Sequence, residues 1–258
     1  MNTSKATQKN LVSIITPAYN SAPWIRACIE SVQAQTYTNW EQIVVIDSGT
    51  TDNTAEIVQE ISDKDPRIKL YRITNGKGLA LARNTAIQNA RGQFVAFLDS
   101  DDIWISNKLT EQVQFMILNS LDMSCCGFRR VSDDLVTVGF LQLPPQNITY
   151  WKLLANNRMA CLTVMIDQSK VGEFQFQEIY HEDFLLWLSL LKKGFKCQGL
   201  QKDLARYRIL KNSRSANKLK MIKVRWKILR EYQKLNFIVS TFYLMLYGLT
   251  SLMKYKKF

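Results

Sequence analysis

Residues 94–102 have the sequence FVAFLDSDD, in which five apolar residues precede three acidic residues and one serine. An apolar run without polar alternation is typical of a strand buried on both faces, as in the parallel sheets of α/β proteins. Polar side chains that follow such a strand lie at its carboxyl end, where open α/β sheets bind their ligands. The segment therefore predicts an α/β fold and indicates the edge of the sheet at which to look for a site.

Further apolar runs and helical patterns alternate before this strand. The apolar runs occupy residues 11–16, 43–46 and 68–71, and the helical patterns occupy residues 24–32, 52–61 and 79–90. Strands without polar alternation that are separated by helices are typical of a parallel sheet covered by helices. We therefore expect an α/β fold with a mostly parallel central sheet flanked by helices.

The pattern becomes less regular after residue 105. We expect helices over residues 107–119, 150–156 and 182–191, strands over residues 161–166 and 204–209, and irregular chain with strand-like pieces over residues 122–148. No Pro-rich or Gly-rich linker marks the change, so we interpret it as a division between two halves of one domain, residues 11–217. For residues 218–258 we expect a basic and apolar tail of amphipathic helices.

The composition excludes several classes of protein. The chain has 258 residues, of which 47% are apolar and 22% charged, as in an ordinary globular domain. Five cysteines without a C-x-x-C pair fit neither a disulfide framework nor a zinc site, and they predict reduced thiols in a cytosolic protein. Because His181 is the single histidine, sites built from several histidines are excluded. Residues 1–10 are polar, and we expect no secretory signal.

Asp99, Asp101 and Asp102 place three carboxylates within four residues. Such carboxylates repel one another unless a cation lies among them. Oxygen ligands favour Mg²⁺ or Mn²⁺, and a metal held by one or two carboxylates takes its other ligands from water and substrate phosphates. The alternative is helix capping, in which Ser100 or Asp102 caps a helix that begins at Ile103. A cap requires only one such residue, so we favour a metal site.

Two more polar clusters follow predicted strands, at residues 16–20 (TPAYN) and 47–54 (DSGTTDNT). In a parallel sheet, these clusters and the acidic one lie at the same edge and could form one cleft. Residues 47–54 are equally compatible with a turn followed by the N-cap of a helix. Residues 75–78 (NGKG) provide a basic loop that could cover a phosphate, whereas the sequence contains no dinucleotide-binding or Walker-type motif.

Five segments, taken in order, resemble glycosyltransferase family 2. They are VSIITPAYN (12–20), VVIDSGTTDNT (44–54), NGKGLALARNTAIQNARGQFVAFLDSDD (75–102), HEDFLLWLSLLKKG (181–194) and YRILKNSRSANK (207–218). The resemblance spans roughly residues 10–218 and is closest to the bacterial surface-polysaccharide type, which builds O-antigen, capsule or teichuronic acid-like chains. It implies a GT-A fold and inverting transfer from a nucleotide-sugar.

The resemblance also implies roles for individual residues. Those expected in the substrate site are Thr16, Ala18, Tyr19, Asp47, Ser48, Arg83, Asp99, Ser100 and Glu182. Asp47 takes the place of the first of two family acids that meet uracil and ribose, and Ser48 replaces the second with a hydroxyl. Asp99 and Asp101 match the D-x-D motif, which implies Mn²⁺ or Mg²⁺ as cofactor, with Asp101 as the metal ligand and Asp102 beside it.

The resemblance implies that Asp183 is the catalytic base. An acceptor hydroxyl is a poor nucleophile and requires a base within hydrogen-bond reach. In-line attack by that hydroxyl would give a β-linkage from an α-linked donor. The residues alone leave helix N-capping as the alternative for Asp183, and Glu182 or His181 could serve as a cap equally well; for His181 we expect an orienting or structural role. Leu210 stands where many relatives have a histidine, so a metal ligand is missing or replaced there.

Most of the positive charge lies near the C-terminal end. The net charge is +12, and residues 192–258 contain 18 Lys and Arg against two acids. Residues 237–253 are uncharged and apolar, and at ~1.5 Å per residue they are shorter than the ~30 Å core of a bilayer. We expect an interfacial segment on an anionic membrane, with residues 254–258 as anchors. The alternative is a helix packed on the enzyme's own surface.

The resemblance, taken with the acidic cluster and the basic tail, implies metal-dependent transfer of one sugar from a UDP-sugar to a glycan or polyprenyl-diphosphate-linked acceptor. We expect a cytoplasmic enzyme, peripheral on the inner face of the cell membrane. A nucleic-acid-binding protein is a competing hypothesis, but the acidic clusters would repel phosphate, so we expect no nucleic acid partner. A processive synthase would carry several membrane spans and a Q-x-x-R-W motif; Arg225 and Trp226 are present, but Ile222 replaces the Gln. An inactive scaffold is the third alternative, against which Asp101 and Asp183 argue.

Overall fold

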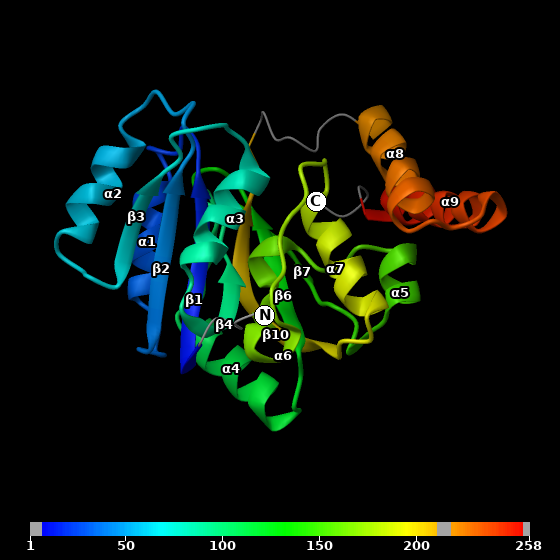
Figure 1. Cartoon of the computed structure of the whole chain (residues 1–258), viewed down its shortest axis with the longest axis horizontal. Helices are drawn as coiled ribbons and strands as arrows, with labels where there is room; N and C mark the ends of the chain where they lie inside the picture. Colours follow the sequence, from blue (N-terminus) through cyan, green and yellow to red (C-terminus); the bar gives the residue numbers. More distant parts are fainter. Residues whose placement is uncertain (1–6, 211–217, 255–258) are drawn as a thin grey trace, which may run out of the picture.

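Ten strands of the described part of the chain form one sheet, and helices lie on both of its faces (Figure 1). The computed structural model describes residues 7–210 and 218–254. Along the main path the strands lie in the order β3-β2-β1-β4-β9-β6-β10-β5, with β7 paired to β6 and β8 paired to β10. The expected α/β class, with a central sheet flanked by helices, is confirmed.

The strands β3-β2-β1-β4 are parallel to one another. Their bounds are Gln8–Ala18 for β1, Trp40–Ile46 for β2, Ile68–Arg72 for β3 and Gly92–Phe97 for β4. Helices α1 (Ile25–Gln33), α2 (Thr54–Ser62) and α3 (Leu79–Asn89) connect consecutive strands. Every residue of β2 is buried, which explains why its sequence shows no polar alternation. Gly92 permits β4 to approach β1 closely, because a Cβ there would lie 2.4 Å from the carbonyl oxygen of Leu11.

The second half of the sheet is mixed, whereas the first half is entirely parallel, and the sheet as a whole remains mostly parallel. Its strands are β5 (Ile103–Trp104), β6 (Met123–Val131), β7 (Val138–Gln142), β8 (Asn147–Ile148), β9 (Met165–Asp167) and β10 (Cys197–Arg208). β9 is antiparallel to both β4 and β6, and it joins the parallel group β3-β2-β1-β4 to the parallel pair β6-β10. β5 and β8 are antiparallel to β10.

Two strand predictions in this half are wrong in extent. Of the strand expected over residues 161–166, Cys161–Thr163 forms a 3₁₀ turn, and only Met165–Asp167 forms β9. The strand expected over residues 204–209 is the end of β10, which begins at Cys197. Gln201 and Lys202 are exposed on β10 and interrupt its apolar pattern. The helices expected over residues 107–119, 150–156 and 182–191 agree better with the structure, where their bounds are Lys108–Leu118 for α4, Tyr150–Ala155 for α5 and Glu182–Lys192 for α7. The short helix α6 (Gln168–Val171) was not predicted.

The core lies in two layers, one on each face of the sheet. Successive residues of β2 alternate between them, because Ile43 and Val45 belong to one cluster and Val44 and Ile46 to the other. Helices α3 and α7 cover the first face, and α1, α2 and α4 cover the second. Trp187 of α7 is fully buried against the ring of Phe97, 5.4 Å away between ring centroids. Helix α7 is buried along almost its whole length, which explains why its sequence is apolar at nearly every position from Phe184 to Leu191.

The C-terminal tail packs beside α5 and α7, at the end of the molecule opposite to β3 and α2 (Figure 1). It consists of α8 (Lys218–Lys227), a π-helical turn (Ile228–Tyr232) and α9 (Phe237–Lys254). Ile228 and Leu229 of the turn are fully buried. Within the described residues, none of the helices has both the length and the apolar character needed to cross a membrane. The expected boundary between residues 217 and 218 lies at the limit of the described residues, and of the expected anchors at residues 254–258 only residue 254 is described.

Candidate active site

The acidic loop follows β4 directly and leads into a strand. Ile103 and Trp104 form β5 and pair with Arg206 and Ala205 of β10. The alternative that Ser100 or Asp102 caps a helix beginning at Ile103 is therefore wrong, because the next helix, α4, begins only at Lys108.

Arg208, at the end of β10, fixes the backbone of the acidic loop. Its Nε donates a hydrogen bond to the carbonyl oxygen of Asp101 at 2.8 Å, and its backbone N–H donates to Oδ1 of Asp102 at 2.9 Å. Asp102 is buried against β10, whereas Asp101 is half-buried. Of the two carboxylates expected at the metal, Asp101 is thus the more accessible. The sequence pattern indicated no role for Arg208, although the segment YRILKN contains it.

Arg83 connects the acidic loop with the start of α7. From its position in α3, its guanidinium donates to Oδ1 of Asp99 and to Oε1 of Glu182, each at 2.7 Å. The guanidinium also lies 5.1 Å from the centre of the Phe176 ring. The neighbouring residue, Asn84, exchanges two hydrogen bonds with the backbone of Phe176 and so holds this ring in place. Three segments that are distant in sequence therefore meet at Arg83.

Asp183 lies in the first turn of α7, next to Glu182. Its Oδ1 accepts a hydrogen bond from the backbone N–H of Phe184, at 2.7 Å, and His181 before it occupies the N-cap position in the left-handed conformation. Burial and the negative charge of Glu182 raise the pKa of Asp183 to about 6, although Arg83 opposes the shift. A carboxylate with this pKa is ionised at neutral pH and is a stronger base than an ordinary aspartate.

The expected nucleotide side of the site lies at the ends of β1 and β2. Asp47 accepts hydrogen bonds from the backbone N–H groups of Gly49, at 2.9 Å, and Gly78, at 2.6 Å. The Ser48 hydroxyl donates to the carbonyl oxygen of Gly76 at 2.7 Å. Asp47 and Ser48 thus attach the glycine loop at residues 75–78 to the end of β2. Both glycines of that loop have positive φ angles, of 84° and 125°, that a residue with a side chain rarely adopts.

Tyr19 presents an open ring beside this turn. Its side chain is 60% exposed, and a Cβ on Gly49 would lie 3.3 Å from the ring and 3.2 Å from Oδ1 of Asp47. An exposed aromatic face next to a carboxylate is a suitable surface for a nucleobase, because the ring can stack and the carboxylate can accept hydrogen bonds.

The side chains of three other expected site residues are less accessible to a ligand. Thr16 is fully buried and its hydroxyl accepts from Nε2 of Gln42, and Ala18 is also buried, so these two lie behind the site. Ser100 is buried as well, and its hydroxyl lies 2.7 Å from that of Ser21. This hydrogen bond ties the loop after β1 to the acidic loop, a contact that the sequence pattern did not indicate.

The acidic loop has the chemistry of a divalent-metal site. Burial and the charge of Asp99 raise the pKa of Asp101 to about 6, and burial and the charges of Asp101 and Asp99 raise the pKa of Asp102. A cation would relieve this repulsion, and an all-oxygen donor set suits Mg²⁺ or Mn²⁺. Among the described residues, no group of three or more His, Cys, Asp or Glu side chains forms a ready-made metal cage. The loop instead fits a metal that takes its remaining ligands from a diphosphate and water.

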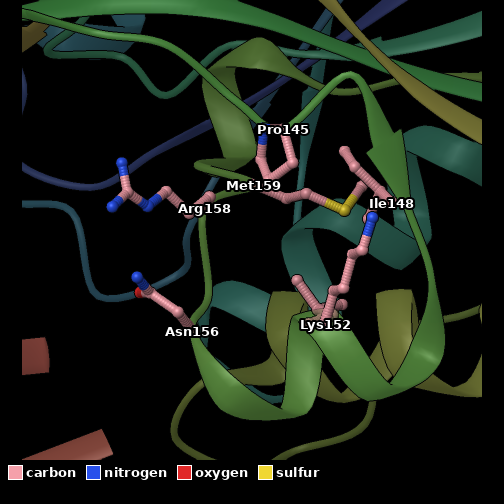
Figure 2. A pocket seen from close by; sticks show the side chains of 7 residues that line it. Pro145, Ile148, Lys152, Asn156, Arg158 and Met159 are labelled. Carbon is pink, nitrogen blue, oxygen red and sulfur yellow. The ribbon is translucent and has the colours of Figure 1, made fainter.

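A small surface hollow lies away from these residues, beside α5 (Figure 2). Its lining residues are Pro145, Ile148, Lys152, Leu153, Asn156, Arg158 and Met159. Since no carboxylate lines it, the hollow is separate from the carboxylate site described above.

The fold and this site together define a GT-A-type glycosyltransferase. The sequence model of glycosyl transferase family 2 matches residues 13–177, and the chain belongs to this family. TuaG of Bacillus subtilis (strain 168), named as a teichuronic acid biosynthesis glycosyltransferase, is 39% identical over 247 residues, which are 95% of this chain and 98% of TuaG. WfgD of Escherichia coli, a UDP-Glc:α-D-GlcNAc-diphosphoundecaprenol β-1,3-glucosyltransferase, is 40% identical over 253 residues and 95% of each chain.

Solved structures of low sequence identity have the same fold. Residues 1–349 of TarS from S. aureus, in complex with UDP, superpose with a TM-score of 0.66 at 20% identity, over 85% of this chain and 65% of that one. The mannosyltransferase PcManGT from Pyrobaculum calidifontis, in complex with GDP-Man and Mn²⁺, superposes with a TM-score of 0.65 at 16% identity, over 90% and 68% of the two chains.

Proposed function

We propose that this glycosyltransferase moves a single sugar from a UDP-sugar to a hydroxyl of a lipid-linked glycan, with inversion, during bacterial surface polysaccharide synthesis. One observation carries the proposal. Arg83 forms two ion pairs, one with Asp99 and one with Glu182, at 2.7 Å each. These contacts bring the donor-side loop that contains Asp101 close to the first turn of α7, which contains the proposed base, Asp183.

In this proposal Asp183 acts as the general base. The acceptor hydroxyl oxygen attacks the anomeric carbon while its proton passes to the Asp183 carboxylate, and the bond between that carbon and the UDP oxygen breaks. One such displacement inverts the configuration, so an α-linked donor gives a β-linked product. The raised pKa of Asp183, about 6, supports this role, since it brings the base closer to the working pH.

The donor lies between the turn at Asp47 and the acidic loop. Tyr19, Asp47 and Ser48 contact the nucleoside, and Arg83, Asp99 and Ser100 lie toward the diphosphate. Asp101 would hold a divalent Mn²⁺ or Mg²⁺, with Asp102 supporting the loop. When bound, this metal supplies positive charge that neutralises the departing diphosphate. Glu182 serves the donor side indirectly, because it keeps the Arg83 guanidinium in place.

The names of two relatives support the proposed chemical class of the acceptor. WfgD acts on a sugar linked to diphosphoundecaprenol, and TuaG is named for teichuronic acid biosynthesis. We infer a polyprenyl-diphosphate-linked acceptor for this chain, and therefore an enzyme located on the cytoplasmic face of the cell membrane and bound to it peripherally. The basic tail is suited to an anionic leaflet.

A transfer assay tests the proposal. The purified chain is incubated with Mn²⁺, a GlcNAc-diphospho-lipid acceptor and one UDP-sugar at a time, and the product is analysed by mass spectrometry and by NMR of the new linkage. We expect one UDP-hexose to give a product with a single added β-linked sugar, and we expect Asp183→Asn to give almost none. Addition of many sugars would support a processive synthase, and an absence of transfer from every donor would support a scaffold.

A further inference from the structure

Helix α9 is attached to the enzyme along one side. Among its described side chains, Ser240 is fully buried, and the Tyr243 ring stacks on Trp151 of α5, with 6.0 Å between ring centroids and 20° between the planes. The Arg225 guanidinium of α8 lies 5.0 Å from the centre of the Tyr247 ring. The alternative that we gave to an interfacial segment, a helix packed on the enzyme's own surface, therefore holds for this side of α9.

The opposite side of α9 is apolar and exposed. Ile238, Phe242 and Met245 are 79%, 55% and 65% exposed, and their spacing of four and three residues places them in one stripe. Phe237, at the start of the helix, is 63% exposed, and its ring contacts Trp226 of α8. Solvent-facing positions of a surface helix are normally polar, and a contiguous apolar stripe marks an interaction surface.

The charge around this apolar stripe indicates which class of partner binds it. Glu231 is the only acidic residue of the tail, and its carboxylate lies 3.8 Å from the Lys227 ammonium. Three further residues of the tail are exposed and positively charged: Lys223 in α8, Arg230 in the π-helical turn and Lys234 just after it. Arg230 donates a hydrogen bond to the carbonyl oxygen of Leu235, which places its guanidinium beside the start of α9. A second copy of the chain would bring the same positive charge, and a nucleic acid would leave the apolar stripe in water. An anionic lipid surface satisfies both features.

We propose that Phe237, Ile238, Phe242 and Met245 form a membrane-docking face, which inserts shallowly into an anionic bilayer with α9 lying in the plane of the interface. Lys223, Lys227, Arg230 and Lys234 contact the lipid headgroups. The inference adds a surface and an orientation to the membrane location in the proposed function. Because α9 stays packed on α5 and α8, docking would hold the candidate active site at a fixed height above the membrane.

Vesicle binding tests this face independently of catalysis. The full chain is mixed with phosphatidylcholine vesicles that contain either no anionic lipid or about one third phosphatidylglycerol, and binding is measured by co-sedimentation. We expect binding only to the anionic vesicles. The double variant Ile238→Glu/Phe242→Glu should weaken it at least tenfold, and the milder Ile238→Gln/Phe242→Gln should do so less strongly. Phe140→Glu, which alters an equally exposed aromatic side chain on β7, is the matched control and should bind as the wild type does.

Several outcomes would overturn the inference. Two of them are vesicle binding by the double variant that equals that of the wild type, and binding that does not depend on anionic lipid. A third is the absence of vesicle binding together with a wild-type chain that is dimeric in sedimentation equilibrium and a double variant that is monomeric. Affinity for duplex DNA that falls with the same variant, without vesicle binding, would also overturn it. UDP binding and thermal unfolding are measured alongside. Vesicle binding by an enzyme that lacks transfer activity would refute the proposed function and leave this surface intact.

Discussion

Arg83 and Glu182 are separated by 99 positions in the sequence, yet their side chains form a buried ion pair at 2.7 Å. The second terminal nitrogen of Arg83 binds Asp99 at the same distance. Glu182 immediately precedes Asp183, and Asp99 lies two residues before Asp101. One guanidinium therefore sets the spacing between the loop expected to hold the metal and the helix that carries the expected base.

Replacing Arg83 should destabilise the fold as well as stop catalysis. Arg83→Met would leave the buried Glu182 carboxylate without its partner, and breaking a buried ion pair in this way costs about 3–5 kcal/mol. The free energy of unfolding, measured in urea, should fall by that amount. Arg26→Met, which removes a half-exposed ion pair with Glu60, is the control and should cost less than about 1 kcal/mol. Equal effects of the two substitutions would contradict this account of Arg83.

The pH dependence of turnover should report Asp183. Since its pKa is raised to about 6, the carboxylate is protonated and unable to accept a proton below that pH. We expect kcat to rise with pH through about 6 and then to level off. Asp183→Asn should lower kcat by about 10²–10⁴-fold with little change in the KM for the donor. A wild-type profile that is flat between pH 5 and 8 would contradict the assignment of the base.

Arg225 should hold the C-terminal tail against α7. Its buried guanidinium lies 3.8 Å from the Phe184 ring centre and donates to the carbonyl oxygen of Leu154 at 2.5 Å. Arg225→Ala would remove the stacking and leave that carbonyl unpaired, so we expect a loss of about 2–4 kcal/mol in the free energy of unfolding. Lys223→Ala, an exposed position on the same helix, is the control and should be nearly neutral. A neutral Arg225→Ala would show that the tail is held by other contacts.

Lys108 should make stability depend on pH. It is fully buried, its ammonium lies 3.5 Å from the Trp104 ring centre, and within the described residues it has no hydrogen-bond partner. Burial lowers the pKa of Lys108 to about 7, below that of an unfolded lysine, so the native state releases a proton first. Stability should therefore rise between about pH 7 and 10. Lys108→Met should abolish that rise and stabilise the protein below pH 7. An unchanged slope in chemical denaturation at several pH values would refute this.

The sequence allowed the carboxyl-end clusters and the helix α7 to be predicted, because both follow from local patterns. An apolar run that ends in polar residues specifies a parallel strand and its ligand-binding end, as β4 and the acidic loop confirm. The strand at Ile103–Trp104 was missed, since two residues carry no periodicity and pair with residues about 100 positions later. The place of β9 in the sheet, antiparallel between β4 and β6, was also missed, because it depends on pairing between residues far apart in the sequence.

Side-chain roles were predicted less completely than strand ends. Asp102 resembled Asp101 in sequence, but its carboxylate accepts from the Arg208 backbone and is buried. Thr16 and Ala18 were expected near the nucleotide, and burial places both behind the surface that a ligand could reach. Such differences depend on which face of the backbone a residue occupies after long-range pairing, and a local motif does not contain that information.

Calorimetric titration of UDP, with and without Mn²⁺, on the wild type and on Asp101→Ala tests the central claim most directly. The account predicts that UDP binds the wild type in the presence of Mn²⁺ and that removal of the metal or substitution of Asp101 abolishes binding. Asp134→Ala, at an exposed carboxylate outside the site, should bind as the wild type does. UDP binding that is the same for Asp101→Ala and for the wild type, or that is indifferent to Mn²⁺, would contradict the assignment of the acidic loop as the metal and diphosphate site.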